Sequence, residues 1–241
     1  MFLVYFTYEV YWMPSKVKYR LLYSASQKFL VGKKFNFLET CYLILSNIPS
    51  LFEGLIRNVP GTFGYVIRRF YYKFRLLHLG KSSLIDVGVH FNGPRNIVIG
   101  DFTWIDVGVK LEATLGFIEI GSRIHIAPYV VIGAREKITI EDFAAIAAGS
   151  KIYSNSETPQ EGLRMSGPMI PESEKAFISK PICIGRDSVV GTNSVLLPGA
   201  NLGRGAVLGA LSLLNRSVPE WEIWAGHPAK KISTRKSIGL N

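Results

Sequence analysis

Aliphatic residues return at every sixth position through the last third of the chain. Six hits follow one another without a slip: Ile184, Val190, Leu196, Leu202, Leu208 and Leu214. A small side chain stands four residues after each of the first five: Ser188, Ser194, Ala200, Ala206 and Ser212. A period of six matches neither an α-helix nor a single strand, so it indicates a structural repeat. We interpret each unit as a short strand and a corner. Three units form a triangular coil, and stacked coils bury an aliphatic column.

The same step is present, less regularly, from Leu84 onward. The residues that keep it are Ile99, Ile105, Leu111, Ile120, Ile126, Ile132, Ile140, Ile146 and Ile152. The step from Ile132 to Ile140 is eight residues long, which predicts a bulged corner within 134–137. The period stops over 153–180, a segment rich in proline and glycine. A long loop inside a regular stack is usually functional.

Residues 1–80 lack this period and are predicted to be mainly helical, with breaks at Pro49 and at Pro60-Gly61. The run 66–75 mixes basic and aromatic side chains. Such a helix can cap the open end of a stack of parallel strands, or lie at a bilayer surface. Both roles stay open, and they can coexist. No stretch of 18 uncharged apolar residues occurs, so no spanning helix is predicted.

These patterns divide the chain into three expected parts. Residues 1–80 form a basic, aromatic helical extension, residues 81–216 form the repeat stack with a loop at 153–181, and residues 217–241 form a tail. The fold class is therefore mainly β, with helices confined to the extension.

Charge is concentrated in the extension. The chain has 241 residues and a net charge of +10, of which residues 1–80 carry +8 together with 19 of the 29 aromatic residues. This favours a partner at a membrane surface. No helix-turn-helix, zinc or RNP pattern accompanies the basic residues, so we expect no nucleic-acid partner. Two cysteines, Cys41 and Cys183, make no disulfide framework, which favours the cytoplasm, with contact at the inner face of the membrane left open.

The repeats, the mid-stack loop and the segment 225–232 (Ala-Gly-His-Pro-Ala-Lys-Lys-Ile) together resemble the hexapeptide-repeat acyltransferases. The resemblance covers roughly residues 80–235. It implies a left-handed parallel β-helix, and the hand comes from the resemblance alone because the usual parallel crossover is right-handed. The segment 225–232 resembles the element that closes the coil in this family.

Within the family, the chain is most similar to sugar O- and N-acetyltransferases of bacterial surface-polysaccharide pathways, including the galactoside- and maltose-type enzymes. The stretches that carry this similarity are 89–101, 123–134, 152–171 and 209–232. The resemblance implies a homotrimer that uses acetyl-CoA and no metal. It also implies active sites between neighbouring subunits and CoA lying along the coils.

Acetyl transfer needs an acceptor nucleophile, a base that takes its proton and donors for the developing oxyanion. The galactoside- and maltose-type relatives place a histidine base five residues after the last regular aliphatic before the loop, where this chain has Glu157. His125 is the other candidate. We hypothesise that His125 of one subunit is the base and that Glu157 of a neighbouring subunit orients it. Which of the two is the base stays open.

The remaining site residues are carried over from the resemblance. Short polar side chains of the loop are candidates to bind sugar hydroxyls: Ser154, Asn155 and Ser156. Residues expected to contact the pantetheine arm of CoA are Thr192, Gly209, Ala210 and Asn215, where Gly209 lets the cofactor approach the backbone. The closing element adds Ala225, Gly226, Lys230 and Lys231, with the lysines near the CoA phosphates.

The expected function is transfer of an acetyl group to a hydroxyl or amine of a sugar, nucleotide-sugar or glycan in surface-polysaccharide synthesis. Oxygen versus nitrogen, and acetyl versus another short acyl group, stay open. Because Glu157 replaces the family's histidine, a second function stays open: a non-catalytic β-helix scaffold for glycan assembly. A zinc hydratase needs three histidines on neighbouring corners, and the four histidines here are scattered.

Overall fold

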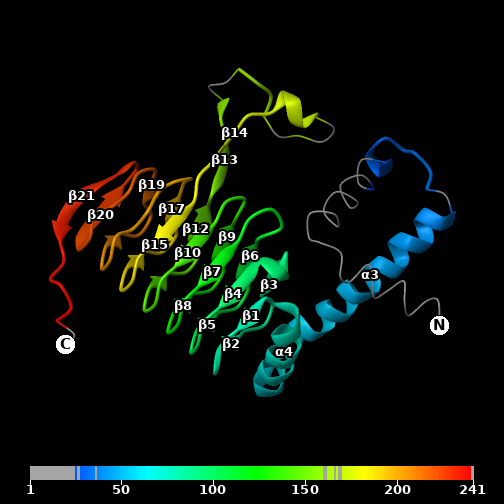
Figure 1. The fold of residues 1–241 in the computed structure, drawn as a ribbon, viewed down its shortest axis with the longest axis horizontal. Coiled ribbons are helices and arrows are strands. Elements are labelled where there is room, and N and C mark those ends of the chain that lie inside the picture. Colours follow the sequence, from blue (N-terminus) through cyan, green and yellow to red (C-terminus); the bar gives the residue numbers. More distant parts are fainter. Residues whose placement is uncertain are drawn as a thin grey trace.

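The computed structural model describes residues 25, 28–35, 37–159, 162–165, 167 and 170–239. The part of the predicted extension before residue 25 lies outside them. The described chain is a left-handed parallel β-helix with two helices at its N-terminal end and a hairpin arm projecting from its side (Figure 1). The fold class predicted from the sequence is therefore confirmed.

Three parallel sheets form the sides of a prism. Sheet A contains β1 (His78–Leu79), β4 (Ile97–Ile99), β7 (Ile118–Ile120), β10 (Ile138–Ile140) and β15 (Ile182–Ile184). Sheet B contains β2 (Leu84–Ile85), β5 (Trp104–Ile105), β8 (His125–Ile126), β11 (Ala145–Ile146), β16 (Val189–Val190), β18 (Val207–Leu208), β20 (Glu222–Gly226) and, antiparallel to β20, β21 (Ala229–Thr234). Sheet C contains β3 (His90–Asn92), β6 (Lys110–Glu112), β9 (Val131–Gly133), β12 (Lys151–Tyr153), β17 (Val195–Leu196) and β19 (Leu213–Leu214).

The aliphatic column predicted from the six-residue step is the core. All six residues of the final run, from Ile184 to Leu214, are at most 2% exposed. The small residues four positions later are buried at the corners, where a larger side chain would not fit. Ser194 shows why a hydroxyl suits this place, because its Oγ donates to the Gly209 carbonyl of the next coil at 2.9 Å. Burial at every corner thus explains why a small residue follows each aliphatic residue by four positions.

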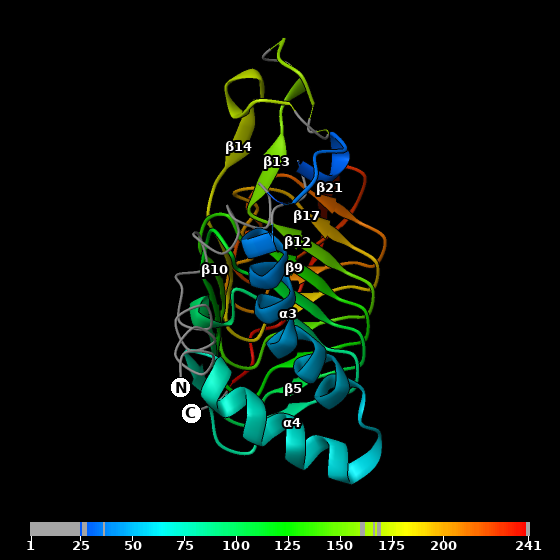
Figure 2. The ribbon, with the colours of Figure 1, turned by 90° about the vertical axis from the view of Figure 1, so that its right-hand side faces the viewer.

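Helices α3 (Phe37–Asn58) and α4 (Gly61–Arg75) lead into the prism. Helix α4 lies at the end of the stack next to β1 and β2 (Figures 1 and 2). Tyr72 is buried there and packs edge-on against Phe91, with ring centroids 4.6 Å apart. Helix α4 therefore covers apolar surface that the first coil would otherwise expose.

One predicted helix break is wrong and the other is confirmed. Helix α3 continues through Pro49, because losing one backbone hydrogen bond need not end a helix whose flanking turns are intact. The break at Pro60-Gly61 is present, with Pro60 extended before α4 begins.

The aperiodic segment forms an arm. Strands β13 (Asn155–Glu157) and β14 (Phe177–Ser179) pair antiparallel, and a short 3-10 helix, η3 (Glu172–Glu174), lies beyond them. Figure 1 shows the arm leaving the stack after β12. Its direction carries Glu157 away from the prism of its own chain.

Candidate functional site

The side chains with candidate chemistry gather along one edge of the prism, the B–C edge, where each coil passes from sheet B to sheet C. Its corners are 86–89, 106–109, 127–130, 147–150, 191–194 and 209–212. Backbone hydrogen bonds link these corners from coil to coil, as from Leu211 N to Thr192 O at 2.8 Å. The edge is thus one continuous strip.

His125 and Asp106 form a close pair on this strip. The His125 Nε2 atom lies 2.8 Å from Asp106 Oδ2, and the carboxylate is 15% exposed while the imidazole is 50% exposed. When Nε2–H donates to the carboxylate, Nδ1 keeps a lone pair that can accept a proton. The Trp104 ring stacks on the imidazole in a tilted arrangement, with centroids 5.3 Å apart. The pair has the composition of a general base with an orienting carboxylate.

Strand register explains the pairing. Trp104 is the parallel partner of His125, and Asp106 follows Trp104 by two residues, so its side chain lies on the same outer face. Sequence reasoning missed Asp106. A longer repeat is visible, because Ile-Asp-Val-Gly-Val occurs at both 85–89 and 105–109, one coil of twenty residues apart. That repeat aligns Asp106 with Asp86, whereas its contact with His125 depends on the register of β5 and β8.

The predicted partner Glu157 is elsewhere in the single chain. It lies on β13, and the arm starts from the far end of sheet C, at the corner opposite the B–C edge. Its side chain is half-buried and engaged within the structure. The pairing of His125 with Glu157 of a neighbouring subunit therefore stays a prediction, and within one chain Asp106 occupies the carboxylate position.

The three loop residues predicted to bind sugar differ in accessibility. Ser154 is fully buried, and its Oγ accepts from the backbone N–H groups of Arg135 and Glu136, both at 2.9 Å. This hydroxyl organises the bulged corner at 134–137, and we do not carry Ser154 into the proposed site. Asn155 and Ser156 lie half-buried on β13.

Most residues predicted to bind CoA lie on the B–C edge. Thr192 and Ala210 are exposed there, on coils that follow His125. Strand β16 is two sheet positions beyond β8, so Thr192 lies about 10 Å farther along the stack. Gly209 packs so closely that an added Cβ would come within 2.9 Å of the Ala225 Cβ. Between His125 and Thr192 the corner at 147–150 carries only small side chains, whereas the large side chains of Tyr129 and Leu211 are exposed on the corners at 127–130 and 209–212.

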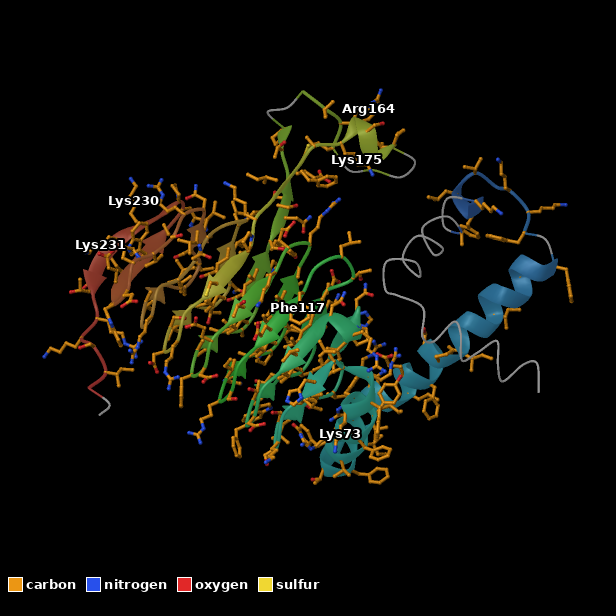
Figure 3. The ribbon with its side chains drawn as sticks, viewed as in Figure 1. Lys73, Phe117, Arg164, Lys175, Lys230 and Lys231 are labelled. Atoms are coloured by element: carbon orange, nitrogen blue, oxygen red, sulfur yellow. The ribbon has the colours of Figure 1, made fainter. Side chains whose placement is uncertain are left out.

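The closing hairpin continues the strip at the C-terminal end. Gly226 donates its N–H to Ser212 Oγ at 3.0 Å, which ties β20 to the last corner. Lys230 and Lys231 are exposed on β21, at the end of the stack remote from Lys73 of α4 (Figure 3). Lys231 forms an ion pair with Glu222 at 2.5 Å, so part of its charge is already compensated. Asn215 follows β19 at the other end of sheet C, away from the strip.

The fold and this strip define an acyltransferase of the left-handed β-helix class. No family model matches the chain. It is 36% identical over 157 residues to a dTDP-4-amino-4,6-dideoxy-D-glucose acyltransferase from Escherichia coli, covering 65% of this chain and 81% of that protein. It is 35% identical to WbbJ of Escherichia coli K12, named as a lipopolysaccharide biosynthesis O-acetyl transferase, covering 75% and 87%. The chain belongs to the hexapeptide-repeat acyltransferase family.

Solved structures agree. AntD from Bacillus cereus, an N-acyltransferase in complex with dTDP and 3-hydroxybutyryl-CoA, superimposes with a TM-score of 0.64 at 30% identity, covering 70% of this chain and 88% of AntD. A hexapeptide-repeat acetyltransferase from Vibrio cholerae matches with a TM-score of 0.54 at 24% identity and supports the fold alone. The family predicted from the sequence is thus confirmed.

Proposed function

We propose that this protein transfers an acetyl group from acetyl-CoA to an amine or hydroxyl of a sugar in bacterial surface-polysaccharide synthesis, with His125 as base and Asp106 as the group that orients it. The observation that carries the assignment is the 2.8 Å contact between these side chains. It lies on the same exposed edge as Thr192 and Ala210, the candidate CoA residues. Relatives named for acyl transfer to an amino sugar and for lipopolysaccharide O-acetylation support the substrate class.

The proposed step needs only one base. His125 removes a proton from the acceptor nitrogen or oxygen as that atom attacks the thioester carbonyl carbon. The carbon–sulfur bond then breaks, and the imidazolium returns its proton to the leaving sulfur of CoA. Asp106 holds the imidazole in the tautomer with Nε2–H and stabilises its transient positive charge. No covalent acyl-enzyme is required.

Substitution of His125 tests this assignment. His125→Ala should lower kcat by roughly 10²–10⁴-fold, because a positioned base contributes about that much. The measurement is release of free CoA thiol against a panel of nucleotide-linked amino sugars and undecorated polysaccharide, with His78→Ala, at the start of β1 in sheet A, as a control. Full activity of His125→Ala would overturn the base assignment. Absence of turnover by the unmodified protein on every acceptor would favour the scaffold reading instead.

Two partner assignments belong to the same proposal. The protein is a homotrimer, in which the arm of one subunit brings Asn155, Ser156 and Glu157 to the B–C edge of a neighbour. The arm's projection away from its own prism supports this (Figure 1). Sedimentation should give three times the chain mass of 26.8 kDa. A monomer that turns over at full rate would contradict it.

The second partner is the membrane surface. Among the described helices, none is long and apolar enough to cross a bilayer. Helix α4 nevertheless exposes Phe63, Phe70 and Phe74 on its outer side, in a segment of strongly positive charge. Phe70→Ser with Phe74→Ser should reduce cosedimentation with anionic vesicles and leave turnover on a soluble acceptor unchanged. Equal cosedimentation of both proteins would contradict membrane contact through α4.

A further inference from the structure

Trp104 stands directly beside the candidate base on the outer face of sheet B. It is the parallel partner of His125, so the two side chains leave neighbouring strands on the same side of the sheet. The centroids of the two rings lie 5.3 Å apart, with an angle of 37° between the ring planes. Trp104 is 45% exposed, although tryptophan is highly buried on average. Core packing therefore does not explain its place next to His125.

The hydrogen bond to Asp106 fixes only one atom of the imidazole. His125 is half exposed, and χ2 of a histidine is a broad torsion, so the ring plane can turn while Nε2 stays close to the carboxylate. Nδ1, the atom left to accept the acceptor's proton, moves with that rotation. A second contact on the ring is needed to hold Nδ1 in one direction, and the Trp104 ring supplies it.

The imidazole is supported from one side of the stack only. Trp104 lies on β5 and Asp106 follows two residues later, so both contacts come from the coil before His125. On the other side, the partner of His125 on β11 is Ala145, whose methyl group covers little of a neighbouring ring. The candidate CoA residue Thr192 lies on a coil in that direction. The base is thus held from behind and open towards the expected thioester.

The contact between the two rings becomes stronger as the reaction proceeds. His125 turns from neutral imidazole into imidazolium when it takes the proton of the acceptor. An indole ring attracts a cation within about 6 Å of its centroid, and the imidazole of His125 is inside that range. An interaction that is stronger in the transition state than in the ground state raises kcat and leaves substrate binding unchanged.

We propose that Trp104 is a positioning residue for the acyl transfer, which fixes the imidazole plane of His125 and stabilises the imidazolium ion. This rests on the proposed function, in which His125 is the base. Trp104 acts through His125 and does not bind either substrate.

The test removes the ring from Trp104 and then restores a smaller one. Trp104→Leu should lower kcat about fivefold or more, because an exposed cation–π contact alone is worth roughly a factor of two to five, with KM for acetyl-CoA and for the acceptor unchanged. Trp104→Phe keeps a ring beside the imidazole and should recover most of the lost rate. Leu84→Ala is the control, because Leu84 is the exposed partner of Trp104 on β2, one strand farther from His125. It should leave kcat unchanged.

A double-mutant cycle separates positioning of the base from direct contact with substrate. If Trp104 acts only through the imidazole, adding Trp104→Leu to His125→Ala should not lower the residual rate any further. A further loss of about fivefold in the double variant, or a raised KM for the acceptor in Trp104→Leu, would show that the indole acts on the substrate and would overturn the proposal.

The same variants distinguish the role of Trp104 from the base assignment. Full activity of His125→Ala overturns the assignment of the base itself. Loss of activity in His125→Ala, together with unchanged kcat in Trp104→Leu, overturns only the role of Trp104. A lower kcat at constant KM, recovery in Trp104→Phe and no additional loss in the double variant support it.

Discussion

Two edges of the same prism share one backbone geometry but have different roles. At the A–B edge, where sheet A passes into sheet B, and at the B–C edge, one residue per coil adopts a left-handed conformation. On the A–B edge these residues are mostly large or charged: Ser82, Phe102, Arg123, Phe143, Asp187, Gly205 and Trp221. On the B–C edge they are Gly88, Gly108, Tyr129, Gly149, Asn193 and Leu211.

The A–B side chains stack on one another along the edge. The Arg123 guanidinium lies 5.5 Å from the Phe102 ring and 5.6 Å from the Phe143 ring. The ladder continues through Arg186, which lies 4.7 Å from Phe143, and ends at Trp221 beneath Arg204 and Arg235. Each cation is attracted to the face of the neighbouring aromatic ring, and the stacked side chains cover the corner. The B–C edge has no such ladder of cations and rings among the described residues, although the Tyr129 ring packs on Gly108 there.

A solenoid can therefore assign stability to one of its edges and function to another. Each corner must satisfy the same backbone geometry, but the side chains outside it are free to vary. Filling one edge with stacked side chains stabilises the stack, and an edge without such a ladder leaves room for a ligand.

The largest effect should come from a bulky side chain on the B–C edge. Ala210→Trp places a large side chain on the exposed B–C edge, at a position with ordinary backbone geometry. KM for acetyl-CoA should rise about tenfold or more, a loss of at least about 1.4 kcal/mol of binding, while KM for the acceptor stays constant. Lys81→Trp, at an exposed position on the A–B edge, is the size-matched control. An unchanged KM for acetyl-CoA in Ala210→Trp would show that the cofactor does not bind along this edge.

A smaller effect should come from opening the covered edge. Arg123→Ala removes contacts to two rings, each worth about 0.5–1 kcal/mol at exposed sites, so the free energy of unfolding should fall by about 1–2 kcal/mol at unchanged kcat. The control is Tyr129→Ala, which alters the left-handed residue of the same coil on the other edge. That variant should change kinetic constants more than stability. The reverse result would mean that the two edges do not divide these roles. Urea unfolding and steady-state kinetics measure both.

The smallest effect concerns the beginning of the B–C edge, where α3 meets the first coil. Burial, and then the charge of Arg57, lower the pKa of His90, whose Nδ1 lies 2.5 Å from Arg57 Nη1. The folded state therefore resists protonation of His90. As pH falls below about 6.5, the unfolded chain gains a proton that the folded chain does not, so stability is lost.

His90→Asn keeps an acceptor for Arg57 and removes the titration. Unfolding by urea at pH 7.5 and pH 5 should show a smaller loss of stability on acidification in the variant than in the unmodified protein. His78→Asn, at the start of β1, is the matched control. Equal pH dependence in all three proteins would assign the acid sensitivity to other groups.

The sequence alone predicted the architecture because burial repeats locally. The interior of a triangular coil requires an aliphatic residue every six positions and a small residue at each corner. Both patterns can be read directly from the sequence. The break at Pro60-Gly61, the interruption at 153–180 and the family were visible too. Local signals misled at Pro49, because neighbouring turns can hold a helix together around one missing hydrogen bond.

The partner of His125 was decided only by the tertiary structure. Asp106 stands nineteen residues earlier and meets the imidazole through the parallel register of β5 and β8. That register depends on how many residues each coil contains, and the bulged corners change the number from coil to coil. Likewise the hydrogen bonds of the interior Ser154 hydroxyl arise where distant segments pack. A hydrophobic period fixes which side chains face inward, but contacts between outward side chains exist only once the coils are stacked.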